Sequence, residues 1–290
     1  IKSMILQNFT KFYPDKENED YIKVLTNTLE SICDCHNFIR DQYDASSVSL
    51  REIRRFNIFF QFFLDYLQNK SKYKDNYKGT YQLLMGTLNI TLYLCYYLRI
   101  SDKKLREELA KILNKYFEGK LFLDMPEREV TYIAEQFIID NEKGIALNRS
   151  LKENLFTSFA CIVNRIPLII VGKPGEGKSL TIQTINQTMK GVYSKSELFK
   201  EYPQLYMYNY QGSDTSTSQG IIETFDKARA YARNQLKKLS KEREKKEKFI
   251  AMIFFDEMSL AERSPNNPLK AIHSQLEYDD NEFKIAFVGS

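Results

Sequence analysis

The sequence contains no tryptophan and has two histidines and four cysteines in 290 residues, which excludes domains that need many zinc ligands. Cys33, Cys35 and His36 lie within four positions of one another. Without further ligands at suitable spacing they cannot close a zinc site, so structural roles are favoured. Cys95 and Cys161 lie in apolar stretches, which is typical of buried free thiols.

The chain also lacks an apolar run near the roughly 20 residues that a transmembrane helix needs, and it lacks a secretory signal. Its cysteines form no disulfide-like framework, so a reduced, cytoplasmic compartment is expected. The 42 basic and 38 acidic residues leave a formal net charge of +4. Residues 237–248 carry that excess alone, and the acidic side chains among them favour a solvated helical extension over a nucleic-acid partner.

Residues 172–179 read GKPGEGKS, which matches the P-loop pattern GxxxxGK[ST]. A chance match in a loop is the alternative, but residues 167–171 are typical of the end of a buried strand and a helix is expected to begin near Lys178. The glycine-rich turn would then direct backbone N–H groups at phosphates. The predicted nucleotide-binding residues are Gly172, Lys173, Pro174, Gly175, Glu176, Gly177, Lys178, Ser179 and Leu180.

Three polar side chains of this segment have an expected effect on nucleotide binding. Lys178 can reach the β- and γ-phosphates of ATP, and the Ser179 hydroxyl is predicted to ligate Mg²⁺. Glu176 places a negative charge beside the predicted phosphates, which opposes tight binding.

A second motif follows 78 residues after Lys178, where the apolar residues 249–255 end in Asp256 and Glu257. A buried parallel strand has this composition, and its carboxyl end is where α/β sheets present ligand-binding groups. Asp256 is therefore a predicted Mg²⁺ ligand. Glu257 is the predicted catalytic residue, which polarises the attacking water. The two motifs together predict an ATP- and Mg²⁺-dependent site that hydrolyses ATP.

Hydrophobic periodicity divides the chain into a helical part and an α/β part. Ser49 and Glu52 form a capping box at the start of one helix, and a boundary is expected near residues 120–126. Strands that alternate with helices around a P-loop predict a parallel sheet with helices on both faces. The other expected elements are helices at 80–99, 102–117, 150–164, from 218 onward and 269–276, and strands at 205–210 and 284–289.

The order of these motifs resembles an AAA+ ATPase, and the details resemble the mysterin family. Mysterins are giant RING-type ubiquitin ligases built on dynein-like AAA+ modules. Tyr210-Gln211-Gly212-Ser213 with Ser216-Thr217 is a weaker match. The stronger matches are Asn37-Phe38-Ile39-Arg40-Asp41, Ser46-Ser47-Val48-Ser49-Leu50-Arg51-Glu52-Ile53, Leu94-Cys95-Tyr96-Tyr97-Leu98-Arg99, Ser150-Leu151-Lys152-Glu153-Asn154-Leu155-Phe156, Ile166-Pro167-Leu168, Val171-Gly172-Lys173-Pro174-Gly175, Asp256-Glu257-Met258-Ser259-Leu260-Ala261-Glu262, Ser264-Pro265 and Pro268-Leu269-Lys270.

This resemblance implies a particular domain organisation. Residues 1–125 would be the all-α helical lid of one AAA+ module, and residues 126–290 the C-terminally truncated large subdomain of the next. Arg51 matches the sensor-2 arginine of such lids and would contact the nucleotide of the preceding module. A solvated arginine in a first helical turn is the alternative. The sensor-1 residue of the family would follow Ser290.

The resemblance further implies an ATP-binding and hydrolysing segment of a giant ubiquitin ligase, with ATP controlling the arrangement of lid and large subdomain. Its partners would be neighbouring AAA+ modules and proteins of the ubiquitin pathway. A RING needs about eight Cys and His ligands, so ubiquitin transfer would reside elsewhere in a longer protein. Two alternatives stay open: a dynein- or midasin-like remodelling ATPase, and a scaffold that binds nucleotide without hydrolysis.

Overall fold

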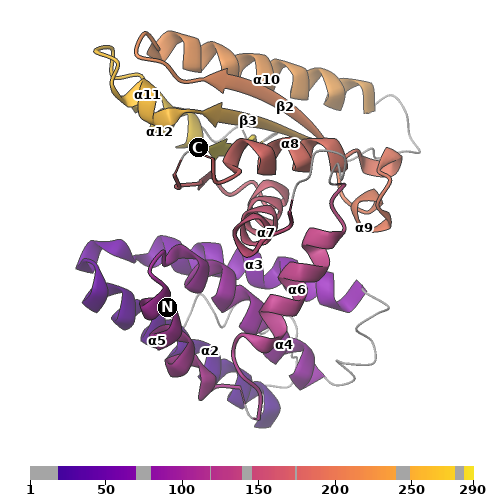
Figure 1. The fold of residues 1–290 in the computed structure, drawn as a ribbon. Coiled ribbons are helices and arrows are strands. Elements are labelled where there is room, and N and C mark those ends of the chain that lie inside the picture. Colours follow the sequence, from indigo (N-terminus) through magenta and orange to yellow (C-terminus); the bar gives the residue numbers. More distant parts are fainter. Residues whose placement is uncertain are drawn as a thin grey trace. The chain divides into compact units, whose positions relative to one another are not determined.

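The computed structural model describes residues 19–69, 80–117, 119–138, 146–173, 175–239, 249–277 and 284–290. It divides into two compact units, of which the first ends at Glu129 and the second begins at Val130. The first unit is helical and the second contains the β-sheet (Figure 1). The division falls inside helix α6 (Asp124–Glu135), four residues beyond the boundary expected from sequence.

The first unit is built from amphipathic helices around an apolar central helix, α4. Helix α3 buries an apolar stripe that includes Phe56, Phe60 and Leu67. Buried side chains such as Leu88, Ile90 and Leu92 lie on successive faces of α4, so this helix is enclosed on several sides. The helical elements of this unit are α2 (Glu19–Gln42), η1 (Ala45–Ser47), α3 (Leu50–Asn69), α4 (Thr80–Cys95), η2 (Tyr97–Arg99), α5 (Lys103–Asn114) and the first half of α6.

Ser49 and Glu52 form the expected capping box at the start of α3. The Ser49 backbone N–H and hydroxyl both donate to Glu52 Oε2, at 2.7 and 2.9 Å. The Arg51 N–H in turn donates to Ser49 Oγ at 3.2 Å. These bonds satisfy N–H groups that have no partner inside the helix, which fixes the first turn of α3.

The helix expected over residues 80–99 ends earlier, because α4 stops at Cys95 and a 3₁₀ turn follows. Tyr96 leaves helical geometry, with φ −123° and ψ −52°. Its hydroxyl lies 3.0 Å from His36 Nε2 on α2, and the residue is fully buried. A tertiary contact therefore ends this helix, although the apolar pattern alone would continue it.

As far as the structure describes it, the second unit contains a four-stranded parallel sheet in the order β1-β4-β3-β2, with helices on both faces as the sequence predicts. Helices α10 and α12 cover one face, and α7 and α8 lie on the other (Figure 1). Its elements are α7 (Arg149–Val163), β1 (Leu168–Ile169), α8 (Lys178–Thr188), η4 (Gly191–Tyr193), α9 (Glu197–Lys200), β2 (Gln204–Gln211), α10 (Ser218–Leu239), β3 (Phe249–Asp256), α11 (Met258–Glu262), α12 (Lys270–Glu277) and β4 (Ala286–Gly289).

The central strand β3 holds the core of this unit together. Alternate side chains point to opposite faces of a strand, so Ile253 and Phe255 face one layer. They pack with Ile221 and Phe225 of α10 and with Phe287 of β4. The resulting cluster fixes the carboxyl ends of β3 and β4 side by side, which places the residues that follow them at one edge of the sheet.

Residues 167–171 do not form the buried strand that the sequence suggests. Leu168 and Ile169 pair with β4, and the Ile170 N–H donates to the Gly289 carbonyl at 2.8 Å. Among the described strands β1 has no second neighbour, because it lies at the edge of the sheet. Ile169 is accordingly 58 % exposed and Val171 is 92 % exposed. The strand before the glycine-rich turn is therefore present, but it is short and marginal.

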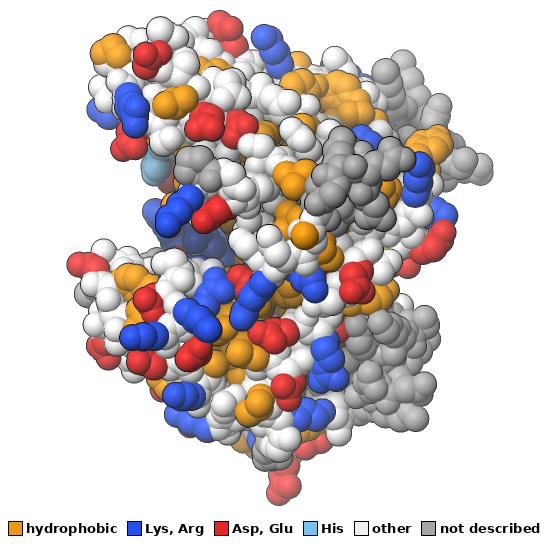
Figure 2. Space-filling model, viewed as in Figure 1, with side chains coloured by type: hydrophobic (Ala, Val, Ile, Leu, Met, Phe, Trp, Pro, Cys, Tyr) orange, Lys and Arg blue, Asp and Glu red, His pale blue; other side chains and the backbone are white. Residues whose placement is uncertain are grey.

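Charged side chains of both signs are interspersed on the face of the molecule seen in Figure 2. This mixture agrees with the small formal net charge of the chain. Most of the expected charged extension, from residue 240 to 248, lies outside the described residues. Helix α10 does run from Ser218 to Leu239, as far as that segment.

Candidate functional site

Two glycines shape the turn between β1 and α8. Gly175 and Gly177 have φ angles of +84° and +77°, which residues with a Cβ rarely adopt. Gly177 is the residue before the first turn of α8, which begins at Lys178 as expected. The turn therefore leads directly into the first turn of α8, whose backbone N–H groups have no partner inside the helix. An anion can accept hydrogen bonds from these groups. Pro174 lies outside the described residues.

The Lys178 side chain folds back over this turn. Its Nζ donates to the carbonyl oxygens of Gly172 at 2.9 Å and Lys173 at 3.1 Å. An ammonium has three donors, so these two bonds orient the third. The positive charge is thus held above the loop that the sequence assigns to phosphate binding.

Glu176 makes a contact inside the turn that the sequence did not predict. Its Oε2 accepts from the Lys173 N–H at 2.9 Å. A Cβ on Gly172 would overlap this carboxylate, so the first glycine of the motif makes room for Glu176. The Glu176 carboxylate therefore connects two residues of the turn and places a negative charge beside the backbone of Lys173.

Ser179 and Asp256 are 77 positions apart, and the fold brings their side chains into contact. The Ser179 hydroxyl lies 3.0 Å from Asp256 Oδ2 and 3.2 Å from Oδ1. Ser179 occupies the second position of α8 and Asp256 is the last residue of β3. Hydroxyl and carboxylate oxygens are the hard ligands that Mg²⁺ prefers, so this donor set fits the expected cation.

Ser290 is a neighbour of Asp256 that sequence reasoning missed. Its hydroxyl donates to Asp256 Oδ1 at 2.6 Å, and its N–H donates to the Phe255 carbonyl at 2.9 Å. The expected parallel sheet could have indicated this contact, because Ser290 follows β4, Asp256 ends β3, and parallel strands end at the same edge of a sheet. Asp256 Oδ1 also accepts from the Glu257 N–H at 3.1 Å.

Glu257 lies immediately beyond β3 with an exposed side chain. Its backbone is left-handed, with φ 54° and ψ 48°, a conformation that costs free energy in a residue other than glycine. Gly212 packs directly against it, since a Cβ there would overlap the Glu257 carbonyl oxygen. The Gly212 N–H also donates to the Asp256 carbonyl at 2.8 Å. Strain and close packing together fix where the Glu257 chain turns.

The other predicted residues occupy separate surroundings. Leu180 lies half-buried in the first turn of α8. Arg51 belongs to the first unit, where it is exposed as the second residue of α3. Cys33 is exposed and Cys35 is buried, and the described residues contain no group of three Cys, His, Asp or Glu side chains that could hold a metal.

Comparison with known proteins adds an independent finding. A family model described as "RNF213 AAA domain" matches residues 144–290, which is more than half of the chain. The chain belongs to the RNF213 AAA domain family. The resemblance to mysterin, the other name of RNF213, is thereby confirmed.

Curated relatives agree with this assignment. The chain is 33 % identical to human "E3 ubiquitin-protein ligase RNF213" over 293 aligned residues that span 94 % of the chain. It is 32 % identical to the zebrafish protein "E3 ubiquitin-protein ligase rnf213-beta" and to mouse RNF213, over 92 % and 85 % of the chain. It spans about 5 % of the length of each relative.

The chain is therefore an AAA+ segment like those of an RNF213-type protein, and its sheet and flanking helices agree with that fold class. AAA domains bind nucleotides in general, which agrees with the glycine-rich turn at the edge of the sheet. Among the helices that the structure describes, none combines the length and apolar character needed to cross a membrane.

Proposed function

We propose that this chain binds ATP·Mg²⁺ at residues 172–180 and hydrolyses it. The observation that carries this proposal is the contact between Ser179 and Asp256 at 3.0–3.2 Å. It unites the glycine-rich turn with the carboxyl end of β3, and P-loop enzymes place phosphates and magnesium between such elements.

In phosphoryl transfer, the protein positions the groups and stabilises charge, and each residue has a task in that scheme. Lys178 would donate to the β- and γ-phosphate oxygens from its place above the loop. Ser179 and Asp256 would hold Mg²⁺, which, when bound, neutralises charge on the phosphate oxygens. Glu257 would orient the attacking water and accept its proton. Ser290 would keep the Asp256 carboxylate in place through its 2.6 Å bond.

We further propose that residues 1–125 are the lid of a preceding AAA+ module and residues 126–290 the large subdomain of the next. In AAA+ modules the lid follows its own P-loop, whereas the helical unit here precedes Gly172 in the sequence. Arg51 would then serve the nucleotide of the preceding module. ATP occupancy between modules would set the rotation of lid against large subdomain, which is a ligand-driven domain motion.

The longer protein is proposed to be a ubiquitin ligase of the RNF213 type, because its relatives carry that name. A cytoplasmic location is part of the same proposal. Neighbouring AAA+ modules and ubiquitin-pathway proteins would be its partners. A zinc-binding ligase domain must then lie outside this chain, which has too few Cys and His residues for one. A remodelling ATPase without ligase activity is the second candidate, and the exposed Glu257 beside Asp256 is compatible with both.

Replacing Glu257 with Gln tests hydrolysis directly. The variant keeps the shape of the side chain but loses the carboxylate, so ATP stays bound while hydrolysis slows by about 10²-fold or more. Glu262→Gln is the matched control, because Glu262 is an exposed residue at the end of α11. The assay measures phosphate release from the full protein with its other P-loops silenced.

An unchanged rate in Glu257→Gln would show that Glu257 has no catalytic role. If the wild-type site binds ATP and releases no phosphate, the scaffold alternative holds and hydrolysis is wrong. Ubiquitin transfer by the full protein separates the ligase from the remodelling ATPase.

A further inference from the structure

Met258 follows Glu257 directly and is the first residue of α11. Its backbone N–H donates to the Ser290 carbonyl at 2.8 Å, and the Ser290 N–H donates to the Phe255 carbonyl at 2.9 Å. These two bonds join the chain that follows β3 to the chain that follows β4. The residue next to the proposed catalytic Glu257 is therefore attached to the neighbouring strand.

The side chain of Met258 packs against β4 at Gly289. Gly289 is buried, and a Cβ at this position would overlap the Met258 sulfur. Met258 also packs against the core cluster that contains Phe255 and Phe287. The thioether thus occupies the space that the missing Gly289 side chain leaves, and a flexible methionine side chain suits such an irregular gap.

Close approach, rather than backbone conformation, explains the glycine at position 289. Gly175 and Gly177 have positive φ angles, whereas Gly289 is not among the described glycines that do. Apart from Met258 and the two chain neighbours, the nearest atom that a Cβ on Gly289 would meet is Phe287 Cε1 at 3.5 Å, an ordinary van der Waals distance. A side chain at this position is therefore opposed by Met258 in particular.

Glu257 is held from both strands that neighbour β3. On the β2 side, Gly212 packs against the Glu257 carbonyl oxygen. On the β4 side, the next residue, Met258, is fixed by its bond to Ser290 and by its contact with Gly289. The left-handed backbone of Glu257, with φ 54°, costs free energy and persists only where surrounding contacts impose it. Loss of the β4 contact would let this turn relax and move the Glu257 carboxylate.

We propose that Met258 is a positioning residue for Glu257, whose turn it holds through its thioether against Gly289 and its N–H bond to Ser290. This proposal rests on the hydrolytic role of Glu257 proposed above. It concerns where the carboxylate meets the attacking water and leaves Lys178 and the phosphate-binding turn untouched. The rate of ATP hydrolysis should therefore depend on Met258, whereas ATP affinity should not.

Met258→Ala tests the side-chain contact, because it keeps the backbone bond to Ser290 and empties the space beside Gly289. We expect turnover to fall by about ten-fold while ATP affinity stays within about two-fold of wild type, since a small displacement of a catalytic group is costly. Met258→Leu has a similar volume and should restore most of the rate. Phosphate release and calorimetric ATP titration are measured on the full protein with its other P-loops silenced.

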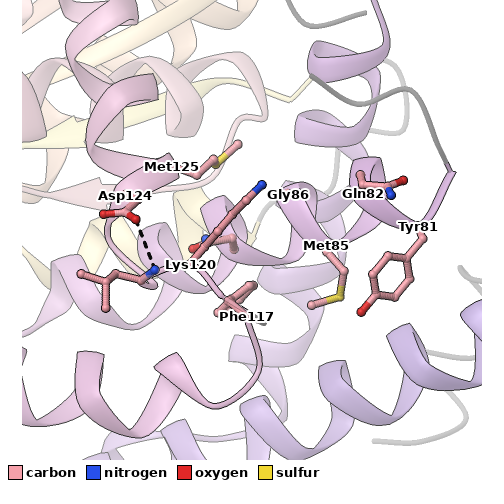
Figure 3. A pocket seen from close by; sticks show the side chains of 10 residues that line it. Tyr81, Gln82, Met85, Gly86, Phe117, Lys120, Asp124 and Met125 are labelled. Carbon is pink, nitrogen blue, oxygen red and sulfur yellow. Dashed lines mark hydrogen bonds between the residues drawn. The ribbon is translucent and has the colours of Figure 1, made fainter. Parts of the chain in front are cut away.

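Met125→Ala is the matched control, because it removes the same thioether from a half-buried methionine of the first unit. Met125 lies near the start of α6 and lines a hollow there together with Met85 and Phe117 (Figure 3). It belongs to neither β3 nor β4. Turnover and ATP affinity should therefore both be unchanged in this variant.

Gly289→Ala tests the same contact from the other side. In the wild-type background its Cβ displaces the Met258 thioether, so turnover should fall about as far as in Met258→Ala. In the Met258→Ala background the added Cβ meets Phe287 at an ordinary distance, so the second substitution should lower turnover by less than about two-fold. This non-additivity is the result expected if the two residues act through one contact.

Wild-type turnover in Met258→Ala would overturn the positioning role. A loss of ATP affinity that parallels the loss of turnover would overturn it too, because the substitution would then disturb the whole site. Equal effects of Gly289→Ala in both backgrounds would show that the contact does not couple the two residues. These outcomes differ from failure of the proposed function, in which the wild-type protein itself releases no phosphate and the positioning role is overturned with it.

Discussion

At the residue scale, the Asp256 carboxylate is where three segments of the chain meet. Its Oδ1 accepts from Ser290, from the Glu257 N–H and, at longer distance, from Ser179. In the proposed function, Ser179 and Asp256 would hold Mg²⁺ in place of their mutual hydrogen bond. The bonds from Ser290 and the Glu257 N–H would keep the Asp256 carboxylate oriented for that role.

Gly212 offers a test of how the catalytic turn is held. Because a Cβ on residue 212 would overlap the Glu257 carbonyl oxygen, Gly212→Ala must displace the backbone beside Glu257. We expect ATP hydrolysis to fall by about 10-fold or more, since small displacements of catalytic groups are costly. Steady-state phosphate release and ATP affinity are measured on the same preparation.

Gly220→Ala is the matched control for that substitution. A Cβ there would approach the ends of the Tyr210 and Thr217 side chains, which can move, and alanine suits the first turn of α10. Equal hydrolysis rates in wild type and Gly212→Ala would contradict the positional role of Gly212.

The sequence predicted which residues form the candidate site better than it predicted their contacts. Ser179 and Asp256 could be expected to meet, because a glycine-rich turn and a strand end belong at the same edge of a parallel sheet. The contacts of Ser290 and Gly212 depend on strand order and on close backbone approach, which no local pattern encodes. The Glu176 bond to Lys173 depends on the shape of the turn itself.

At the scale of single elements, neighbouring residues determine where these helices begin. The ends of helices and strands depend on contacts with residues far away in the sequence. The capping box at Ser49 and the Asn148 cap, which accepts from the Leu151 N–H at 2.9 Å, both lie within three residues of the helices they begin. By contrast, the end of α4 depends on Tyr96 and His36, which are 60 positions apart. The short β1 likewise reflects its position at the edge of the sheet.

The capping box of α3 makes the stability of the first unit depend on pH. Burial raises the pKa of Glu52, but the Ser49 N–H and hydroxyl bonds and the Arg99 charge outweigh burial and leave the pKa below its ordinary value. The unfolded chain then binds the proton more readily. The stabilisation is therefore present above about pH 4.3 and is lost as the pH falls through the folded pKa.

Glu52→Gln isolates this contribution, because glutamine keeps the shape of the side chain without titrating. We expect wild type to be more stable than the variant at pH 7 and the difference to shrink as the pH falls from 5 to 3. Urea denaturation followed by circular dichroism measures the free energy of unfolding at each pH. A difference that stays constant over this range would contradict the assignment.

At the scale of the whole molecule, the chain consists of a helical unit followed by an α/β unit. That order was predictable, because the hydrophobic pattern is helical before residues 120–126 and alternates between helix and strand after them. The position of the division was less predictable, since α6 runs continuously across it. The sequence has no glycine or proline at Glu129 and Val130, where the first unit ends and the second begins. The exact position of the division was therefore not marked in the sequence.

The order of the two units predicts that Arg51 does not serve the P-loop of this chain. Arg51→Ala should leave the ATP affinity of the site at residues 172–179 unchanged within about two-fold. In the full protein it should weaken ATP binding at the preceding module, for which it would be the sensor-2 arginine. Calorimetry with individual P-loops silenced separates the two sites, and a large loss at the site of Lys178 would contradict the assignment of the units to different modules.

The central claim is that residues 172–180 hold the phosphates of ATP, and calorimetric titration with ATP and Mg²⁺ tests it most directly. Lys178→Ala removes the ammonium held above Gly172 and Lys173, and we expect ATP affinity to fall by about 2 kcal/mol or more. Lys195→Ala, which removes an exposed lysine outside the turn, should leave the affinity unchanged. Equal ATP affinity in wild type and Lys178→Ala would contradict the account.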